Sequence, residues 1–152
     1  MKNEKTVAVL NTLITINNDR IEGYETASKE TEEQDLKTLF AQFSATSQKC
    51  KQELDAEVKK LGGEPAEGTK TSGKFFRVWM DVKAALTGKD RKAILNSCEY
   101  GEDQAKDTYE RALENDIENL SLEQQTMIKA QHTLLRADHD KVKSMRDLAM
   151  AD

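Results

Sequence analysis

The sequence is poor in cysteine. Its 152 residues include only Cys50 and Cys98, and no Cys-x-x-Cys pair occurs. Two cysteines are too few for a secreted disulfide framework, so we expect reduced thiols. The helical pattern places the two residues at different levels of a bundle, beyond the reach of a disulfide. We therefore interpret both as small core residues.

The sequence also lacks a long apolar run and an excess of positive charge. Residues 1–6 are polar, and the apolar stretch after them is broken by Asn11, Asn17 and Asn18. We find no signal-peptide core and no span of about 18 apolar residues, and we expect a cytoplasmic protein without membrane insertion. The formal net charge of -5 argues against general affinity for nucleic acid or anionic membranes.

Only one proline, Pro65, interrupts the chain, and it follows Gly62 and Gly63. A glycine pair followed by proline is a typical end of a helix, and residues 62–73 form the principal predicted loop. At 152 residues with a 37% hydrophobic share, the chain is long enough for one core and too short for two comfortable ones. A single domain over residues 1–152 is predicted.

Apolar residues recur at three- and four-residue steps, which is typical of helices packed on one side. The pattern predicts helices at about 6–29, 32–61, 73–87, 90–115 and 121–149. Capping-box matches, Thr31 with Gln34 and Ser121 with Gln124, indicate two of the helix starts. The 73–87 helix carries Trp79 and is expected to cover one end or side of the bundle.

Two hairpins of long helices joined by a long connection predict an all-α, ferritin-like four-helix bundle, with a crossover that contains a short extra helix. In the 90–115 helix, small residues replace large ones along the core line at Cys98, Gly101 and Ala105. Glu99 and Glu102 flank that line. His132 and His139, seven residues apart on the last helix, are both predicted to point inward.

Several motifs carry a resemblance to a known family. They are Asn-Asn-Asp-Arg-Ile-Glu-Gly-Tyr-Glu-Thr-Ala at 17–27, Leu-Gly-Gly-Glu-Pro at 61–65, Trp-Met-Asp-Val-Lys-Ala-Ala-Leu-Thr-Gly at 79–88, Cys-Glu-Tyr-Gly-Glu-Asp at 98–103, His-Asp-Lys at 139–141 and Arg-Asp at 146–147. Together they resemble the PA2169 family of bacterial four-helix-bundle proteins, the DUF2383 group. The resemblance implies a ferritin-like bundle of bacterial origin, in a family without an established activity.

The acids and imidazoles raise the question of a metal centre. Counting residues along helices of equal rise places Glu22, Glu99, Glu102 and His139 at a common level, as candidate ligands for iron, manganese or zinc. A full di-iron set is missing, because the second helix offers no ligand at that level and Arg136 stands where a Glu-x-x-His motif needs its acid. The alternatives are a single or degenerate metal site and a structural polar core.

Nothing in the sequence supports nucleophilic catalysis or a phosphate-binding loop. Our first hypothesis is a non-enzymatic bundle that acts through its surface, with a stress-related or assembly role and a homodimeric state. The second is a ferritin-like metal-binding oxidase or iron-handling protein that uses the four candidate ligands. The third is a lipid- or peptide-binding groove lined by Trp79 and the phenylalanines.

Overall fold

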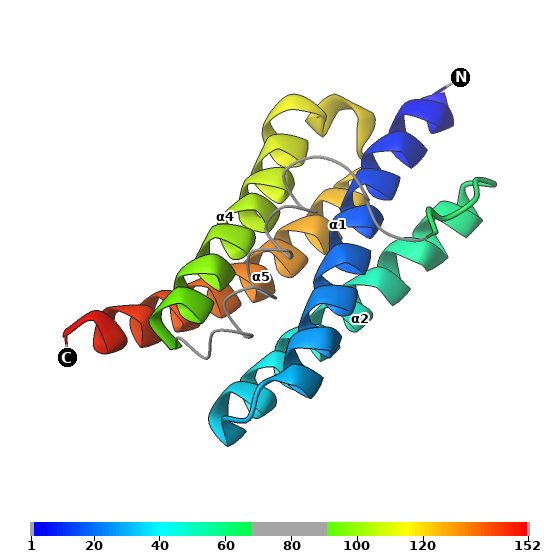
Figure 1. The fold of residues 1–152 in the computed structure, drawn as a ribbon. Helices are drawn as coiled ribbons and strands as arrows, with labels where there is room; N and C mark the ends of the chain where they lie inside the picture. Colours follow the sequence, from blue (N-terminus) through cyan, green and yellow to red (C-terminus); the bar gives the residue numbers. More distant parts are fainter. Residues whose placement is uncertain (1, 68–90, 152) are drawn as a thin grey trace.

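The computed structural model describes residues 2–67 and 91–151, and these residues form a four-helix bundle (Figure 1). The elements are α1 (Lys2–Glu30), α2 (Gln34–Lys60), α4 (Arg91–Asn115), the short 3-10 helix η1 (Ile117–Asn119) and α5 (Leu122–Ala151). The described ranges contain no strand, so the predicted all-α class is confirmed. The predicted helix at 73–87, with Trp79 and two phenylalanines, lies outside the described residues.

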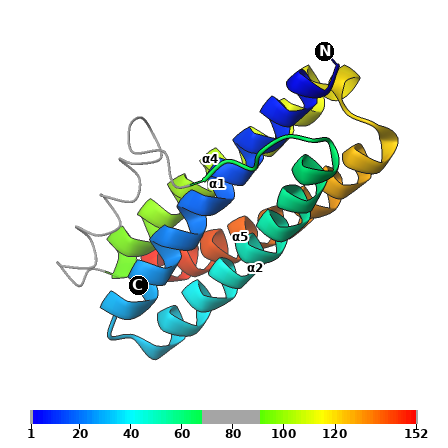
Figure 2. The ribbon, with the colours of Figure 1, turned by 90° about the vertical axis from the view of Figure 1, so that its right-hand side faces the viewer.

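The four helices form two antiparallel hairpins, α1 with α2 and α4 with α5, which pack side by side (Figures 1 and 2). Between the hairpins, α1 contacts α4 and α2 contacts α5. Thr6 near the start of α1 bonds to Asn119 just after α4, whereas Tyr24 near the end of α1 bonds to Glu102. α1 and α4 are therefore antiparallel, and α2 and α4 run in the same direction. The connection between α2 and α4 must join opposite ends of the bundle, as the predicted crossover requires.

The apolar core consists of two clusters along the bundle axis. One contains Leu10, Leu13, Ile14, Leu54, Val58, Tyr109, Ile128 and Leu135. The other contains Tyr24, Leu36, Phe40, Phe43, Ile94, Leu95, Cys98 and Val142. On each of these four helices, one buried or half-buried polar residue lies between the residues that belong to the first cluster and those that belong to the second. These four residues are Arg20, Ser47, Glu102 and Asp138, and we call them the polar layer.

One of the two predicted capping boxes is present. The Ser121 amide donates to Gln124 Oε1 at 2.9 Å, and the Gln124 amide donates to Ser121 Oγ at 3.1 Å, which confirms the box at the start of α5. The prediction of a capping box at Thr31 is wrong. The Thr31 amide still bonds to Ala27 O at 3.0 Å and continues the last turn of α1, so α2 begins at Gln34 with no side-chain cap.

The end of α2 follows the predicted glycine order. Gly62 has a φ of 83°, a left-handed conformation that side-chain-bearing residues rarely adopt. The Gly62 and Gly63 amides bond to the last carbonyls of α2, at 3.0 Å each. None of the helices in the described ranges carries an apolar stretch sufficient to span a bilayer.

Candidate functional site

The polar layer is centred on Arg20, whose side chain is almost completely buried. Its Nη2 donates to Glu102 Oε1 at 2.6 Å and to Asp138 Oδ2 at 3.1 Å, and its Nη1 donates to Ser47 Oγ at 2.5 Å. Each helix thus supplies one member: Arg20 from α1, Ser47 from α2, Glu102 from α4 and Asp138 from α5. The layer joins all four helices at one level.

Aromatic rings border this layer on one side. The Tyr24 hydroxyl donates to Glu102 Oε1 at 2.6 Å, and its ring stacks on Phe40 with 5.5 Å between ring centroids. The Arg20 Cζ atom lies 5.4 Å from the centroid of the Tyr24 ring, within range of a cation–π interaction. Glu102 Oε1 therefore accepts two short bonds. Glu102 Oε2 and Arg20 Nε have no hydrogen-bond partner among the described residues.

Burial and ion pairing have opposite effects on the charges in the layer. Burial alone would lower the pKa of Arg20, but the negative charges of Glu102 and Asp138 outweigh it and raise that pKa above its ordinary value. Burial raises the pKa of Asp138 to about 6, against the opposing effect of Arg20, and the charge of Glu102 adds to the increase. One guanidinium thus faces two carboxylates, those of Glu102 and Asp138.

A second chain of polar side chains crosses the bundle one level away. Asn17 Nδ2 donates to Tyr109 Oη at 2.8 Å, and Tyr109 Oη donates to Gln131 Oε1 at 2.7 Å. Gln131 Nε2 continues the chain to Glu53 Oε1 at 3.0 Å. Asn17 is buried on α1, where a polar group needs a partner, and Tyr109 supplies one.

The structure brings together only two of the four candidate metal ligands that the sequence indicated, Glu99 and His139. Glu102 is bonded to Arg20 and Tyr24 in the polar layer. Glu22 is exposed on α1. Glu99 and His139 lie together, and a third residue that residue counting did not select, Asp103, completes their group. One ligand atom from each of Glu99, Asp103 and His139 lies within 4.8 Å of the others.

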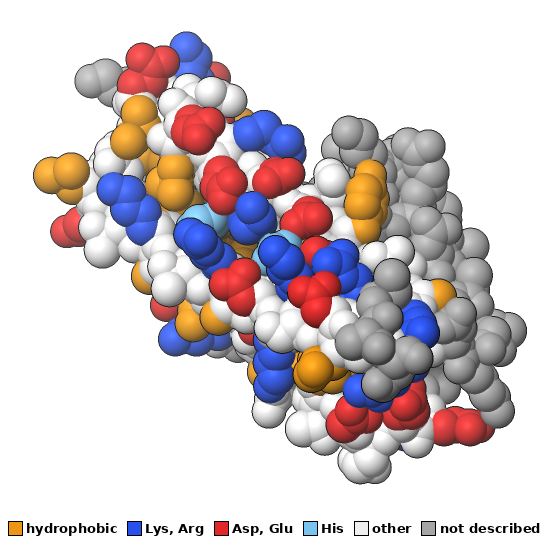
Figure 3. Space-filling model, turned by 90° about the vertical axis from the view of Figure 1, so that its left-hand side faces the viewer, with side chains coloured by type: hydrophobic (Ala, Val, Ile, Leu, Met, Phe, Trp, Pro, Cys, Tyr) orange, Lys and Arg blue, Asp and Glu red, His pale blue; other side chains and the backbone are white. Residues whose placement is uncertain are grey.

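Both histidines lie at the edge of the core, which corrects the predicted inward orientation. The buried positions of α5 include Gln131, Leu135 and Val142. His132 comes directly after Gln131 in the sequence and therefore lies beside this buried stripe. His132 Nε2 lies 3.0 Å from Glu110 Oε2, and His139 Nε2 lies 2.5 Å from Asp103 Oδ1. In Figure 3 both imidazoles are visible on one face among acidic and basic side chains.

The two cysteines are free and buried, as predicted. Burial raises the pKa of Cys50 to about 11, and burial also raises the pKa of Cys98 above its ordinary value. Because the thiolate is the reactive form, both thiols are poor nucleophiles near neutral pH.

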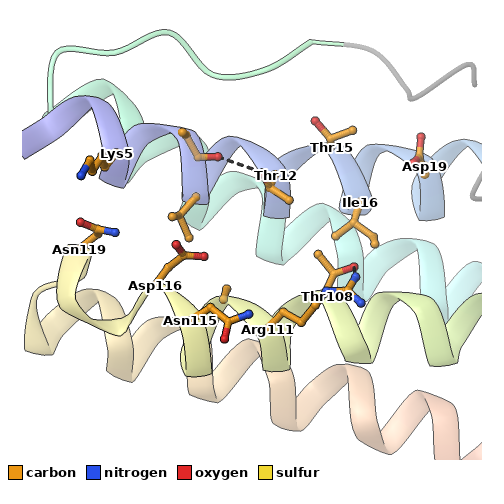
Figure 4. A pocket seen from close by; sticks show the side chains of 13 residues that line it. Lys5, Thr12, Thr15, Ile16, Asp19, Thr108, Arg111, Asn115, Asp116 and Asn119 are labelled. Carbon is orange, nitrogen blue, oxygen red and sulfur yellow. Dashed lines mark hydrogen bonds between the residues drawn. The ribbon is translucent and has the colours of Figure 1, made fainter. Parts of the chain in front are cut away.

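A groove of about 1010 Å³ lies between α1 and the C-terminal half of α4 (Figure 4). Its hydroxyl groups include Thr12, Thr15 and Thr108, and each of these donates to a carbonyl of its own helix. Both histidines of the chain are bonded elsewhere, so no hydroxyl of the groove has an imidazole base of the kind that activates a nucleophile. The groove contains no organised catalytic set among the described residues.

Comparison with known proteins identifies a family but indicates no activity. Residues 5–115 match a family model described as "Domain of unknown function (DUF2383)". The match includes Arg20, Ser47 and Glu102 and ends before α5, which supplies Asp138 and His139. No curated protein sequence matches the chain.

Proposed function

The chain belongs to the DUF2383 family, and we propose that it is a non-enzymatic helical-bundle protein that acts through its surface rather than through chemistry in its core. The position of Arg20 carries this proposal. Its guanidinium lies at the centre of the polar layer, bonded to a side chain from each of the other three helices.

In di-iron bundles, carboxylates and histidines from four helices surround two metal cations near mid-bundle. In this chain the comparable carboxylates, Glu102 and Asp138, already have a positive partner that is part of the polypeptide. A divalent ion between them would lie against the buried positive charge of Arg20. Charge repulsion in a medium of low dielectric constant opposes such binding. This arrangement favours a structural polar core over a metal centre at this level.

The remaining buried groups support the same proposal. Ser47 Oγ accepts a hydrogen bond from Arg20 and has no base beside it among the described residues. Tyr24 and Tyr109 are buried, and burial raises the pKa of each phenol well above its ordinary value. Neither phenol supplies a proton acceptor near neutral pH. On the surface, Leu122 and Leu148 of α5 are 80% and 71% exposed and are available to contact another protein.

An iron-oxidation assay tests this proposal. Ferrous iron is added aerobically to the purified protein, and oxidation is followed by absorbance and oxygen uptake against a protein-free blank. We expect no acceleration over the blank. Faster oxidation that Glu102→Gln abolishes and Glu22→Gln leaves intact would overturn the proposal, because it would place iron chemistry at the layer that Arg20 occupies.

A metal-binding oxidase or iron-handling protein that uses Glu22, Glu99, Glu102 and His139 is the second candidate. The proximity of Glu99 and His139 favours it. Two facts place it second: Glu22 is exposed, and Glu102 is bonded to Arg20. The same assay with His139→Ala tests it, because an iron-oxidising site built on His139 would lose its activity.

A further inference from the structure

The seam between α4 and α5 brings three metal-ligating side chains together outside the polar layer. Glu99 and Asp103 are four residues apart on α4, so they lie one above the other on one face of the helix. His139 reaches them from the antiparallel helix α5. One ligand atom of each lies within 4.8 Å of the other two, and His139 Nε2 is 2.5 Å from Asp103 Oδ1.

We propose that Glu99, Asp103 and His139 bind one divalent transition-metal cation, in exchange with the Arg146 guanidinium. Two carboxylates and one imidazole suit zinc, manganese and ferrous iron, whereas calcium and magnesium prefer sites made of oxygen alone. Ligand atoms lie about 2.0–2.2 Å from such an ion, so atoms on opposite sides of it are roughly 4 Å apart. The three side chains therefore need only a small rotation to enclose a cation.

A second, independent observation is the hydrogen bond on the far side of the imidazole. His139 Nδ1 lies 3.1 Å from Asp140 Oδ1, while His139 Nε2 faces Asp103. A carboxylate at one ring nitrogen fixes the tautomer and orientation in which the other nitrogen binds a metal, and it makes that nitrogen a stronger ligand. Asp140 therefore positions His139 for the ion.

Arg146 shows that this site attracts a cation. Its guanidinium forms an ion pair with Glu99, and the carboxylate atom in this pair, Oε2, is buried. Arg146 also pairs with Asp147 at 2.8 Å and is 25% exposed in its side chain. It can therefore turn toward Asp147 and leave Glu99 to a metal ion. The Asp103 side chain is 43% exposed, which gives an ion and its remaining water ligands a path from solvent.

The chain offers a matched control one step along the same seam. His132 lies seven residues before His139 on α5 and pairs with Glu110 of α4 at 3.0 Å. Among the described residues it has no second acid of this kind, and Lys106 lies 3.8 Å from Glu110. His132 is thus a similarly placed imidazole without a ligand set.

The test is a titration of chelator-treated protein with Zn²⁺ by calorimetry, together with the absorption spectrum of Co²⁺ as a probe of the ligands. We expect one ion per chain, at least tenfold weaker binding in His139→Ala, and a change of less than twofold in His132→Ala. Arg146→Ala removes the competing cation, so it is expected to bind zinc several-fold more tightly. Circular dichroism of each variant confirms that it is folded.

Equal losses of zinc affinity in His132→Ala and His139→Ala would overturn the inference, since general binding to the protein surface would then explain the bound zinc. Absence of binding to the wild-type protein at millimolar zinc would overturn it too. Neither result depends on the iron-oxidation assay. Zinc bound at the seam is compatible with a core that oxidises no iron, so the failure of one proposal is distinguishable from failure of the other.

Discussion

Replacing Glu102 by Gln removes one negative charge from the polar layer and retains the shape of the side chain. Glu102 is 1% exposed, and its Oε1 accepts bonds of 2.6 Å from both Arg20 and Tyr24. After the substitution the guanidinium of Arg20 remains buried, with Asp138 at 3.1 Å as its remaining charged partner. The variant therefore leaves a buried positive charge only partly compensated.

Removing one member of a buried ion pair typically costs 3–5 kcal/mol in unfolding free energy. The lower end applies to this site, because the amide oxygen of Gln still accepts the Tyr24 hydrogen bond and Asp138 still faces Arg20. We expect a loss of about 3 kcal/mol. With a urea slope of about 2 kcal/mol/M, the unfolding midpoint falls by roughly 1.5 M.

Urea unfolding followed by circular dichroism at 222 nm measures this loss. Glu22→Gln is the control, since it makes the same chemical change at an exposed position of α1 and is expected to cost less than about 0.5 kcal/mol. In Arg20→Met/Glu102→Gln no unpaired guanidinium remains, so the double variant is expected to lose less than the sum of its single variants. If Glu102→Gln shifted the midpoint no more than Glu22→Gln, the reasoning about the layer would be refuted.

Three further predictions concern other polar groups. Tyr109→Phe deprives Asn17 and the buried Gln131 of a hydrogen-bond partner and is expected to cost about 1–3 kcal/mol in urea unfolding. Ser121→Ala removes the cap of α5 and is expected to cost about 1 kcal/mol in the same assay. Asp138 has a folded-state pKa raised from 3.8 to about 6, so the folded state binds more protons than the unfolded state in that window. Its contribution to stability falls as pH rises from 4 to 6, by about 2 kcal/mol, and Asp138→Asn removes this dependence.

Each of these predictions has a direct check. For Tyr109→Phe, an unfolding midpoint equal to that of the wild-type protein would show that the hydroxyl is replaced without cost. For Ser121→Ala, the companion Ser121→Asp retains an acceptor and is expected to restore most of the lost stability. For Asp138, unfolding is measured at pH 4, 5, 6 and 7, and a constant difference between wild type and Asp138→Asn would contradict the assigned role.

The helices could be predicted because their signals are local. For the four long helices that the structure describes, apolar spacing and the Gly62–Gly63 pair placed the helix ends within four residues, with the largest difference at Lys2, where α1 begins. The Ser121 box was predictable because no preceding helix uses that residue. The Thr31 box failed because the same residue is required at the end of α1, a competition that a four-residue motif does not reveal.

The polar layer was harder to predict because its members come from four separate helices. Arg20 has a signal in the sequence: it lies three residues after Asn17 and four before Tyr24, on the buried stripe of α1. A charged residue on an apolar stripe indicates a buried partner, but the stripe does not identify which acid it meets. Asp103 was missed because its selection depends on the rotation of α5 about its axis, which places His139 at the edge of the core.

At mid-bundle, the guanidinium of Arg20 balances the carboxylates of Glu102 and Asp138. Anomalous diffraction from crystals grown with zinc tests it most directly. We expect Arg20 side-chain density that joins Glu102 and Asp138 without an anomalous peak between them, and a peak at Glu99, Asp103 and His139. An anomalous peak between Glu102 and Asp138, with Arg20 displaced, would contradict it.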